Sequence, residues 1–578
     1  MAEKTPHHIL STDVLILGSG GAGLFAALHA HQANPQLSIT VAVKGLLGKC
    51  GCTRMVQGGY NVALAKEDSV ERHFMDTIEG GKWLPDQELA WQLVTLAIER
   101  VKELENELGC FFDRNPDGSI HQKAFAGQTF DRTVHKGDLT GIEIINRLAE
   151  QVWARNIQRL EEHRAVELIK NPSGDAIAGV LFVNLRTGEY VFVRAKAVLL
   201  ATGGGPTMYK YHTPSGDKSC DGLAMALRAG LPLRDMEMVQ FHPTGLLAGT
   251  HTRMTGTVLE EGLRGSGGYL LNGARERFMP RYDPLGERAT RDVVSRAMFT
   301  EMSKKTTSPH GGLYISMAHL GPERVAREFK GMVERCADCG FDLAGGLVEV
   351  VPTAHYMMGG VEFRGDCSTE LAGLFVAGED SGGVHGANRL GGNGVANSTV
   401  FGAVAGDAMA GWVRERDFTP PDEHAIDAAV AACEAPFGRP VSPNLNEIRE
   451  RLYEVMWERV GIIRDAATLA QAQAELAALE TELDAFGLAD DNRAFNLSWH
   501  DWMNLKSLTT VSRAIAAAAA VRRDSRGAHF RADHPQSGPL ESSAFTRLRL
   551  HERAFRVETR PVAFTRVRPG QTLLQHVA

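Results

Sequence analysis

The stretch from Asp13 to Gly23, DVLILGSGGAG, constrains what this chain can fold into more than any other segment. An apolar run enters a turn with Gly18, Gly20 and Gly23 in G-x-G-x-x-G spacing, and helix-forming residues follow at once. This order predicts a buried strand, a tight turn and a helix, with a pyrophosphate at the helix N-terminus. Because a Gly-rich turn also occurs for packing alone, the rest of the chain decides between the two interpretations.

A chain of 578 residues is too long for one hydrophobic core, and at about 100 to 200 residues per domain it divides into three or four parts. The net charge of -8 provides no cationic face, so we expect no nucleic-acid partner. No apolar run reaches the roughly 18 residues that span a bilayer, and the N-terminus lacks a charged segment followed by an apolar one. We therefore expect a cytoplasmic protein without direct membrane insertion.

The eight cysteines are scattered along the chain, which favours reduced thiols over a disulfide framework. Cys336 and Cys339 form a lone C-x-x-C, and the spacing of a four-cysteine cluster does not accompany it. We expect this chain to hold neither a metal ion nor an iron-sulfur cluster of its own.

The segment from Leu37 to Val43 predicts the second parallel strand of a dinucleotide fold. Lys44 follows it, where NAD-binding domains usually carry an acidic ribose partner, so NAD is disfavoured and FAD stays open. Farther along, AIAGVLFVNL and YVFVRAKAVLLATGG predict two strands around a hairpin-like RTGE. The second strand runs into Gly203 and Gly204, which permits a second close approach to a dinucleotide.

Two segments between these predicted strands allow only general structural predictions. From Ser69 to Gly109 apolar residues recur three and four apart, which predicts helical packing. The polar, Gly-punctuated segment from Gln122 to Gly141 predicts a loop, either one that reaches a ligand or a solvated connector.

The composition changes between Gln240 and Pro352, where His, Arg, Glu and Gly become dense, and this predicts an inserted domain that carries a site. From Leu371 to Gly394 the strand-then-glycine pattern of the N-terminus returns, so the first domain is discontinuous. Beyond about Gly411 the pattern is helical, and the segment from His529 to Ala578 predicts a small strand-containing tail. One helical stripe consists of Leu469, Leu476, Leu479 and Leu483.

Motifs of high specificity span nearly the whole chain: GSGGAG, ATGGG, DGLAMALRAG, DMEMVQFHPTG, GLRGSGGYLLN, TRDVVSRA, HYMMGG, GEDSGGVHGANRLGGN and RRDSRGAH. In this order they resemble the flavoprotein subunit of succinate dehydrogenase and fumarate reductase, with L-aspartate oxidase as a close relative. The resemblance implies an α/β fold, in which an α+β capping domain interrupts a Rossmann-like FAD-binding domain and a helical domain and a small C-terminal domain follow. The expected bounds are 1–240 and 352–411 for FAD binding, 241–351 for the cap, 412–528 for the helices and 529–578 for the C-terminal domain.

The resemblance also implies a small dicarboxylate at the junction of the FAD-binding and capping domains. It assigns the substrate carboxylates to His242, His355 and Arg389, and it places Phe125 and Glu260 in the same pocket. Arginine suits this task because its planar fork binds a carboxylate bidentately.

By the same resemblance, Arg291 is the catalytic acid or base, and Glu261 and Arg264 form its proton relay. A guanidinium has a pKa above about 12, so this role requires neighbouring positive charge and desolvation to make loss of the proton easier.

For the flavin, the resemblance carries over contacts along the whole cofactor. They are Gly18, Gly20 and Gly23 at the pyrophosphate, Lys44 near the adenosine, Cys52, Thr53 and Gly58 near the isoalloxazine, Gly203 at the second glycine turn, and Asp221 and Glu379 for polar contacts.

Three positions depart from the family pattern. Cys52 stands where succinate dehydrogenases carry a histidine bonded to FAD, so we expect non-covalent FAD, with a thioether from Cys50 or Cys52 as the alternative. Glu260 replaces a carboxylate-binding threonine, and an anion there repels a carboxylate unless it is protonated, turned away or paired with a cationic group of the substrate. Gly394 stands where the family usually has serine.

The resemblance implies an oxidoreductase that interconverts succinate and fumarate, or a close analogue, by hydride transfer at flavin N5. Electron transport to a separate iron-sulfur subunit would place it at the cytoplasmic face of the inner membrane through partner subunits. Loss of the covalent histidine favours reduction, because a covalent bond normally raises the flavin potential. The alternatives are a stand-alone L-aspartate oxidase or dehydrogenase, in which Glu260 meets the substrate ammonium, and a non-catalytic flavin-bearing assembly subunit.

Overall fold

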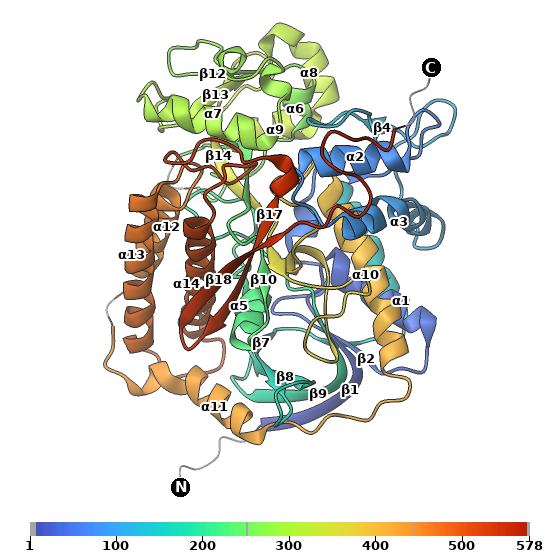
Figure 1. Ribbon diagram of the computed structural model, residues 1–578, viewed down its shortest axis with the longest axis vertical. Helices are drawn as coiled ribbons and strands as arrows, with labels where there is room; N and C mark the ends of the chain where they lie inside the picture. The colour runs from blue at the N-terminus through green and yellow to red at the C-terminus, as the bar shows by residue number, and fades with distance from the viewer. Residues whose placement is uncertain (1–6, 250–251, 443, 575–578) are drawn as a thin grey trace.

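In the computed structural model, which describes residues 7–249, 252–442 and 444–574, a seven-stranded sheet lies at the lower end of the molecule as drawn in Figure 1. Its strands, in spatial order, are β6 (Gln158–Leu160), β2 (Ile39–Ala42), β1 (His7–Leu17), β9 (Tyr190–Leu200), β8 (Ile177–Asn184) and β7 (His163–Lys170), and β16 (Leu374–Val376) also pairs with β9. The pairs β1–β2, β2–β6, β1–β9 and β9–β16 are parallel, and β7, β8 and β9 form an antiparallel extension. The predicted Rossmann-like sheet and the hairpin within it are confirmed.

Strand β1 leads through the Gly18 turn directly into α1 (Gly21–Ala33). Gly18 has a φ of 111°, which side-chain-bearing residues rarely adopt, and a Cβ on Gly23 would lie 2.0 Å from the Gly18 carbonyl oxygen. The tight turn and the close packing of helix on strand therefore both require glycine, as the spacing predicts. Helix α1 packs along α10 (Asn393–Trp412), although α10 lies much later in the chain. Both helices belong to the region around the seven-stranded sheet, which we call the body.

The predicted helical stretch from Ser69 to Gly109 consists of two helices, α2 (Val70–Gly80) and α3 (Gln87–Asn106). The side chains of Ser69 and Asp86 accept hydrogen bonds from backbone N–H groups in the first turns of these helices. Pro85 lies in the break, because a proline cannot continue the preceding helix. Two further helices of this body are α4 (Thr140–Trp153) and α5 (Asp221–Arg228).

The capping region forms the upper lobe in Figure 1 and has an apolar core of its own. Its antiparallel sheet has the order β11 (Val239–Leu246), β14 (Leu347–Met357), β13 (Leu313–Ser316) and β12 (Tyr269–Leu271). Its helices are α6 (Gly262–Gly265), α7 (Arg291–Ser303), α8 (Pro322–Glu328) and α9 (Lys330–Asp338). The chain enters this lobe through β11 and leaves it through β14, so these two paired strands join the lobe to the body below.

Helices α11 (Glu423–Glu434), α12 (Leu445–Arg459), α13 (Ala466–Ala485) and α14 (Leu497–Val521) follow; α12, α13 and α14 stand along the left side of the body in Figure 1. The predicted stripe of α13, from Leu469 to Leu483, is buried against the neighbouring helices. The tail holds β17 (Ala544–His551) and β18 (Ala554–Pro561), and β17 pairs with β10 (Leu233–Arg234), which in turn pairs with β15 (Gly360–Val361). The predicted strands of the tail thus complete a sheet shared with the body.

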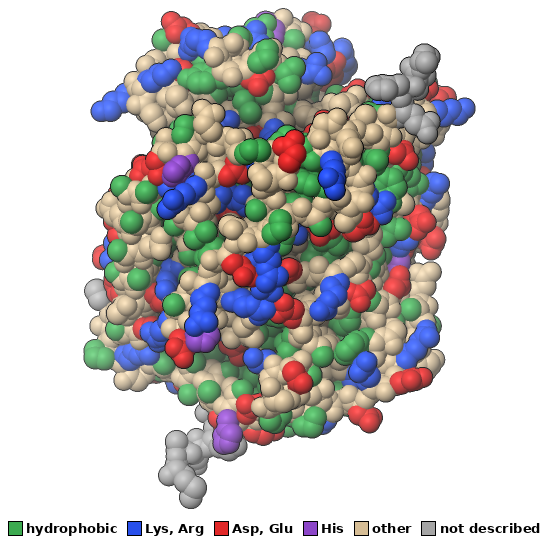
Figure 2. Space-filling model, viewed as in Figure 1, with side chains coloured by type: hydrophobic (Ala, Val, Ile, Leu, Met, Phe, Trp, Pro, Cys, Tyr) green, Lys and Arg blue, Asp and Glu red, His purple; other side chains and the backbone are tan. Residues whose placement is uncertain are grey.

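Acidic and basic side chains are interspersed on the face drawn in Figure 2. Part of this mixture lies on the tail hairpin, where the Arg547 guanidinium forms ion pairs with Glu362, Glu370 and Glu558.

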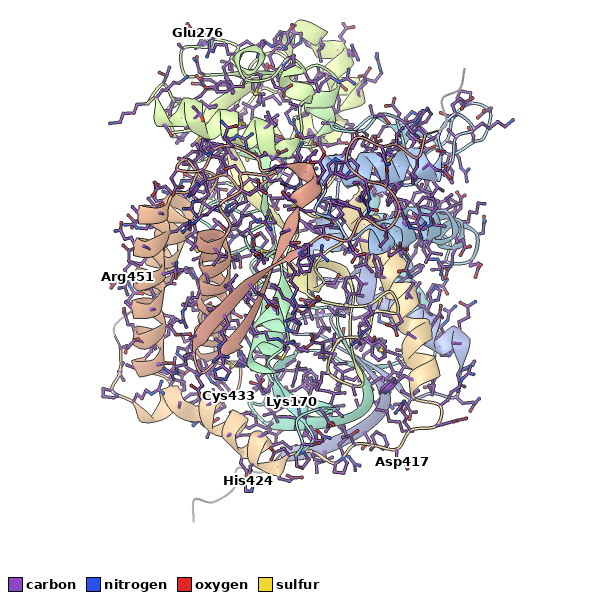
Figure 3. The ribbon with its side chains drawn as sticks, viewed as in Figure 1. Lys170, Glu276, Asp417, His424, Cys433 and Arg451 are labelled. Atoms are coloured by element: carbon purple, nitrogen blue, oxygen red, sulfur yellow. The ribbon has the colours of Figure 1, made fainter. Side chains whose placement is uncertain are left out.

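All eight cysteines are free thiols, as predicted. Cys433, labelled in Figure 3, lies on α11 near the lower end of the molecule, away from the lobe that carries the labelled Glu276. Cys336 lies in α9 and is buried, so the C-x-x-C of the sequence contributes its first thiol to the core of the capping region.

Candidate active site

A cavity of about 490 Å³ is lined by residues of both the body, which contains the seven-stranded sheet, and the capping region. This volume is within the range of about 300 to 1,000 Å³ that is typical of small-molecule sites. A smaller cavity of about 60 Å³ adjoins it and shares five lining residues with it: Gly20, Gly51, Thr202, Gly203 and Lys218. Of the residues predicted for the site, all except Gly23 and Arg264 line one of these two cavities.

The joining strands carry the two predicted histidines of the substrate pocket. His242 lies on β11 and His355 on β14, and their ring centroids are 5.4 Å apart. The His355 Nδ1 atom is 2.8 Å from the Thr213 hydroxyl, which fixes the ring. Burial and the neighbouring Arg291 hold the pKa of both histidines well below the usual value, so both rings are neutral near pH 7.

Arg389 lies in the turn before α10, with its guanidinium 4.5 Å from the centroid of the Tyr356 ring. Burial, together with the nearby Arg291, lowers the pKa of Arg389 to about 10, so it stays cationic at neutral pH. Because the two histidines are neutral, Arg389 and Arg291 provide the positive charge beside them.

Gln240 connects these two arginines. Its side-chain oxygen accepts hydrogen bonds from Arg291 Nη1 and from Arg389 Nη2, each at 3.1 Å, and its amide nitrogen donates to the Arg389 carbonyl at 2.7 Å. The side chain is 1% exposed and belongs to β11. Gln240 therefore fixes the distance between an arginine of the capping helix α7 and one of the FAD-binding body.

Arg291, Glu261 and Arg264 form a continuous buried chain. Glu261 accepts hydrogen bonds from Arg291 Nη2 at 2.6 Å and from Arg264 Nη2 at 3.0 Å. Burial raises the pKa of Glu261, but Arg291 and Arg264 outweigh it and lower this pKa to about 2. Arg291 begins α7 and faces the cavity, whereas Arg264 lies behind Glu261 and is fully buried.

Glu260 also lines the cavity, and its carboxylate forms an ion pair with Lys123. Burial raises the pKa of Glu260 in spite of this partner. The expectation from sequence considered a protonated carboxyl, one turned away, or one paired with the substrate; the structure instead supplies the cation from the protein itself. Phe125 lines the same pocket, with its ring centroid 5.7 Å from Lys123 Nζ.

At the other end of the site, Lys44 and Asp221 lie in direct contact at the wall of the smaller cavity. Lys44 Nζ is 2.9 Å from Asp221 Oδ2, and Arg164 Nη2 is 2.7 Å from Asp221 Oδ1. Burial raises the pKa of Asp221, but Arg164 and Lys44 overcome this and hold it well below the usual range. Asp221 is therefore an ionised, buried acceptor beside the first glycine turn.

The second predicted glycine turn is held by an acid that the sequence interpretation missed. Asp380 accepts hydrogen bonds from the Thr202 hydroxyl and from the Gly203 N–H at 3.1 Å. The neighbouring Glu379 accepts from the Met357 N–H at 2.9 Å, and burial raises the pKa of Glu379 to about 6.

Cys52 begins a short 3₁₀ helix, Cys52–Met55, at the edge of the main cavity, close to Thr53 and Gly58. Burial and the nearby Glu379 raise the pKa of the Cys52 thiol to about 12. At neutral pH this thiol is therefore protonated and a poor nucleophile.

The two adjoining cavities have features that suit a bound FAD. Gly20 is the N-cap of α1, lines both cavities and brings no side chain over the helix N-terminus. A Cβ on Gly203 would meet nothing closer than Lys218 Nζ at 3.6 Å, so the turn leaves room for a close ligand. The buried side-chain oxygen of Gln57, at the larger cavity, has no hydrogen-bond partner among the described residues. It is available to a polar cofactor.

Gln240 and Lys123 lie in segments that were recognised from the sequence, but the sequence alone did not indicate a role for either residue. Gln240 stands two residues before His242, and Lys123 stands two residues before Phe125. For Gln240 the available signal was strand alternation, which predicts that residues two apart face the same side; Lys123 lies in a segment predicted as a loop and had no such signal.

Comparison with known proteins agrees with this geometry. The family described as FAD binding domain matches residues 13–395, and the family described as fumarate reductase flavoprotein C-term matches residues 449–573. The chain thus contains an FAD-binding domain, as predicted.

Two similar proteins are named as subunits of fumarate reductases. One subunit of the fumarate reductase (CoM/CoB) of Methanothermobacter marburgensis is 39% identical over 536 residues, which cover 91% of this chain and 95% of that protein. The fumarate reductase flavoprotein subunit of Escherichia coli is 35% identical over 545 residues, which cover 90% of this chain and 88% of that protein.

Two solved structures share the whole fold. FrdA of Escherichia coli quinol fumarate reductase matches with a TM-score of 0.91 and 32% identity, covering 98% of this chain and 99% of that one. Sdh1 of Mycobacterium smegmatis matches with a TM-score of 0.86 and 35% identity, covering 96% of this chain and 95% of that one.

These relatives are subunits of larger assemblies, and within the described ranges of this chain no helix is long and apolar enough to cross a membrane. The family matches and the relatives extend over the FAD-binding body, the capping lobe and the C-terminal helices alike. The chain therefore belongs to the family of FAD-binding flavoprotein subunits of fumarate reductases and succinate dehydrogenases.

Proposed function

We propose that this flavoenzyme reduces fumarate, or a close dicarboxylate analogue, to the saturated acid. The observation that carries the proposal is the buried chain of Arg291, Glu261 and Arg264, which opens onto the same cavity as Arg389 and His242. A cavity with cations at one end and a proton-conducting chain beside them suits reduction of a carbon–carbon double bond between two carboxylates.

In this proposal, Arg389 binds one substrate carboxylate bidentately, and His242 and His355 bind through neutral ring N–H groups. Gln240 keeps Arg389 and Arg291 apart at a fixed distance through its two 3.1 Å hydrogen bonds. The substrate is thereby oriented with one alkene carbon toward Arg291.

FAD, when bound and reduced, would supply a hydride from flavin N5. Arg291 would deliver the proton to the neighbouring alkene carbon, so that one hydride and one proton convert fumarate into succinate. Glu261 would then take a proton from Arg264 and pass it to Arg291, along hydrogen bonds of 3.0 Å and 2.6 Å, and a proton from solvent would restore Arg264. Because the pKa of Glu261 is about 2, this carboxylate holds a proton only in transit.

We propose the same residues for the flavin as the resemblance does: Gly18, Gly20 and Gly23 at the pyrophosphate, Lys44 near the adenosine, Cys52, Thr53 and Gly58 near the isoalloxazine, Gly203 at the second glycine turn, and Asp221 and Glu379 for polar contacts. We also propose that electrons reach the flavin from a separate iron-sulfur subunit, through which any membrane association would occur. The names of the relatives as subunits of reductases support a partner.

The assay that tests this function is anaerobic oxidation of reduced viologen by the purified holoprotein with fumarate. We expect turnover with fumarate and inhibition by malonate. L-Aspartate with oxygen is the competing assay, and hydrogen peroxide formation there without fumarate reduction would replace this proposal by an amino-dicarboxylate oxidase. Inactivity with every donor and acceptor would indicate an assembly subunit.

We predict that FAD is bound without a covalent bond. The thiol at the position of the linking histidine, Cys52, is protonated because its pKa is raised to about 12, and it cannot readily attack the flavin methyl group. After acid precipitation, all flavin should remain in the supernatant. A yellow pellet that disappears in Cys52→Ala, but persists in the control Cys110→Ala, would instead show a thioether.

A further inference from the structure

The pocket for a dianionic substrate contains two adjacent carboxylates, Glu260 and Glu261. Glu261 is committed to Arg291 and Arg264, so its charge is balanced within the capping region. Glu260 lies only 5% exposed on the cavity wall, and it has no arginine partner among the ion pairs of the described residues. An unbalanced anion at this position would repel the substrate.

Lys123 balances Glu260 from the other side of the domain boundary. Lys123 belongs to β4 (Gln122–Lys123), in a small sheet of the FAD-binding body with β5 (Thr133–Val134) and β3 (Tyr60–Asn61). Glu260 lies two residues before the first residue of α6 in the cap. Their ion pair therefore crosses between the two regions that enclose the cavity.

The surroundings hold Lys123 in place behind Glu260. Its ammonium also donates to the Gly137 carbonyl at 3.4 Å and lies 5.7 Å from the centroid of the Phe125 ring. The side chain of Lys123 is 19% exposed, and Lys123 is not among the residues that line the cavity. It therefore acts on a bound ligand through Glu260 rather than by touching the ligand.

We propose that Lys123 determines specificity by neutralising Glu260, so that a pocket with a glutamate in its wall accepts a dicarboxylate. This inference deepens the proposed function and rests on it. It assigns the site to substrates with two negative charges. A substrate ammonium group is then not required to balance the charge of Glu260, because Lys123 balances it. Lys123 is a positioning residue, whose loss leaves any charge on Glu260 without a compensating cation.

The test is a double-mutant cycle on the purified holoprotein. Malonate affinity is measured from the change in flavin absorbance, which needs no turnover, and fumarate KM and kcat are measured beside it. The variants are Lys123→Met, Glu260→Thr and the double variant. Lys123→Arg is the conservative replacement, and Lys136→Met is the control, because Lys136 is a 46% exposed lysine of the same segment that pairs with Asp113.

We expect Lys123→Met to weaken malonate binding and raise fumarate KM by about 10-fold or more, with kcat changed by less than about threefold. Glu260→Thr should bind malonate at least as well as the wild type. The double variant should match Glu260→Thr within about threefold, because without the anion the cation has nothing to neutralise. Lys123→Arg should retain most of the affinity, and Lys136→Met should behave as the wild type.

Two outcomes would overturn the inference while leaving the proposed function intact. One is a Lys123→Met variant that binds malonate as the wild type does. The other is a double variant as weak as Lys123→Met, which would show that Lys123 only holds the two regions together. A wild-type holoprotein that binds neither malonate nor fumarate would overturn both the inference and the proposed function. Flavin content, measured for each variant, separates these results from loss of folding.

Discussion

Arg291→Gln should lose turnover by about a thousandfold while FAD stays bound, since a positioned general acid contributes roughly 10² to 10⁴. Glutamine keeps a hydrogen-bond donor near Glu261 but has no proton to transfer to carbon. Arg291 lies at the start of α7 in the capping region, so its replacement leaves the glycine turns at Gly18 and Gly203 unchanged. The measurements are viologen-linked fumarate reduction and the ratio of flavin to protein.

The matched control for this variant is Arg296→Gln. Arg296 lies five residues farther along α7 and stacks its guanidinium 4.9 Å from the centroid of the Phe530 ring, away from the cavity-lining set. Its replacement should leave the rate within about threefold of the wild type, as is usual for partly exposed sites. If Arg291→Gln retained more than a tenth of the wild-type rate, Arg291 would not be the acid.

Arg389→Met should abolish tight dicarboxylate binding. Loss of one partner of a buried, hydrogen-bonded charge pair costs about 2 to 5 kcal/mol, which is roughly 30-fold or more in affinity. Methionine fills a similar volume and removes one of the two arginine hydrogen bonds that the Gln240 side-chain oxygen accepts. Malonate titration of the bound flavin is the direct measurement, and kcat/KM for fumarate should fall by at least the same factor.

Arg335→Met is the control, since Arg335 also lines the cavity but donates to the Val258 carbonyl at 3.1 Å. It should weaken malonate binding much less than Arg389→Met. Equal losses in both variants would mean that the cavity attracts dicarboxylates by its general charge, and the bidentate role of Arg389 would be wrong.

The FAD-binding fold could be predicted from sequence because its constraints are local. Gly18 and Gly23 are required by the turn and by packing over a few residues, and the strand, turn and helix follow one another directly. The helical stripe from Leu469 to Leu483 is likewise a matter of spacing along one helix. Segment boundaries were less accessible: Ser69 to Gly109 reads as one helical pattern, but Pro85 and two N-caps divide it.

Which residues line the site could also be predicted from the sequence, because each of them lies in a motif that identifies it. The structure brings Phe125, His242, Arg291, His355 and Arg389 to one cavity from segments far apart in the chain. The charge states of these side chains could not be predicted from the sequence. Neutral histidines result from burial beside arginines, and the low pKa of Glu261 results from two guanidinium groups that flank it in space.

By itself, the sequence determined the class of fold, the cofactor and the family of chemistry, since each depends on residue types at fixed spacing. Only the tertiary structure decided which cation pairs with Glu260 at the wall of the cavity. Its partner Lys123 lies 137 residues earlier and on the other side of the domain boundary. Electrostatic energies depend on distance through space and on burial, and neither quantity is encoded in the spacing of residues along a chain.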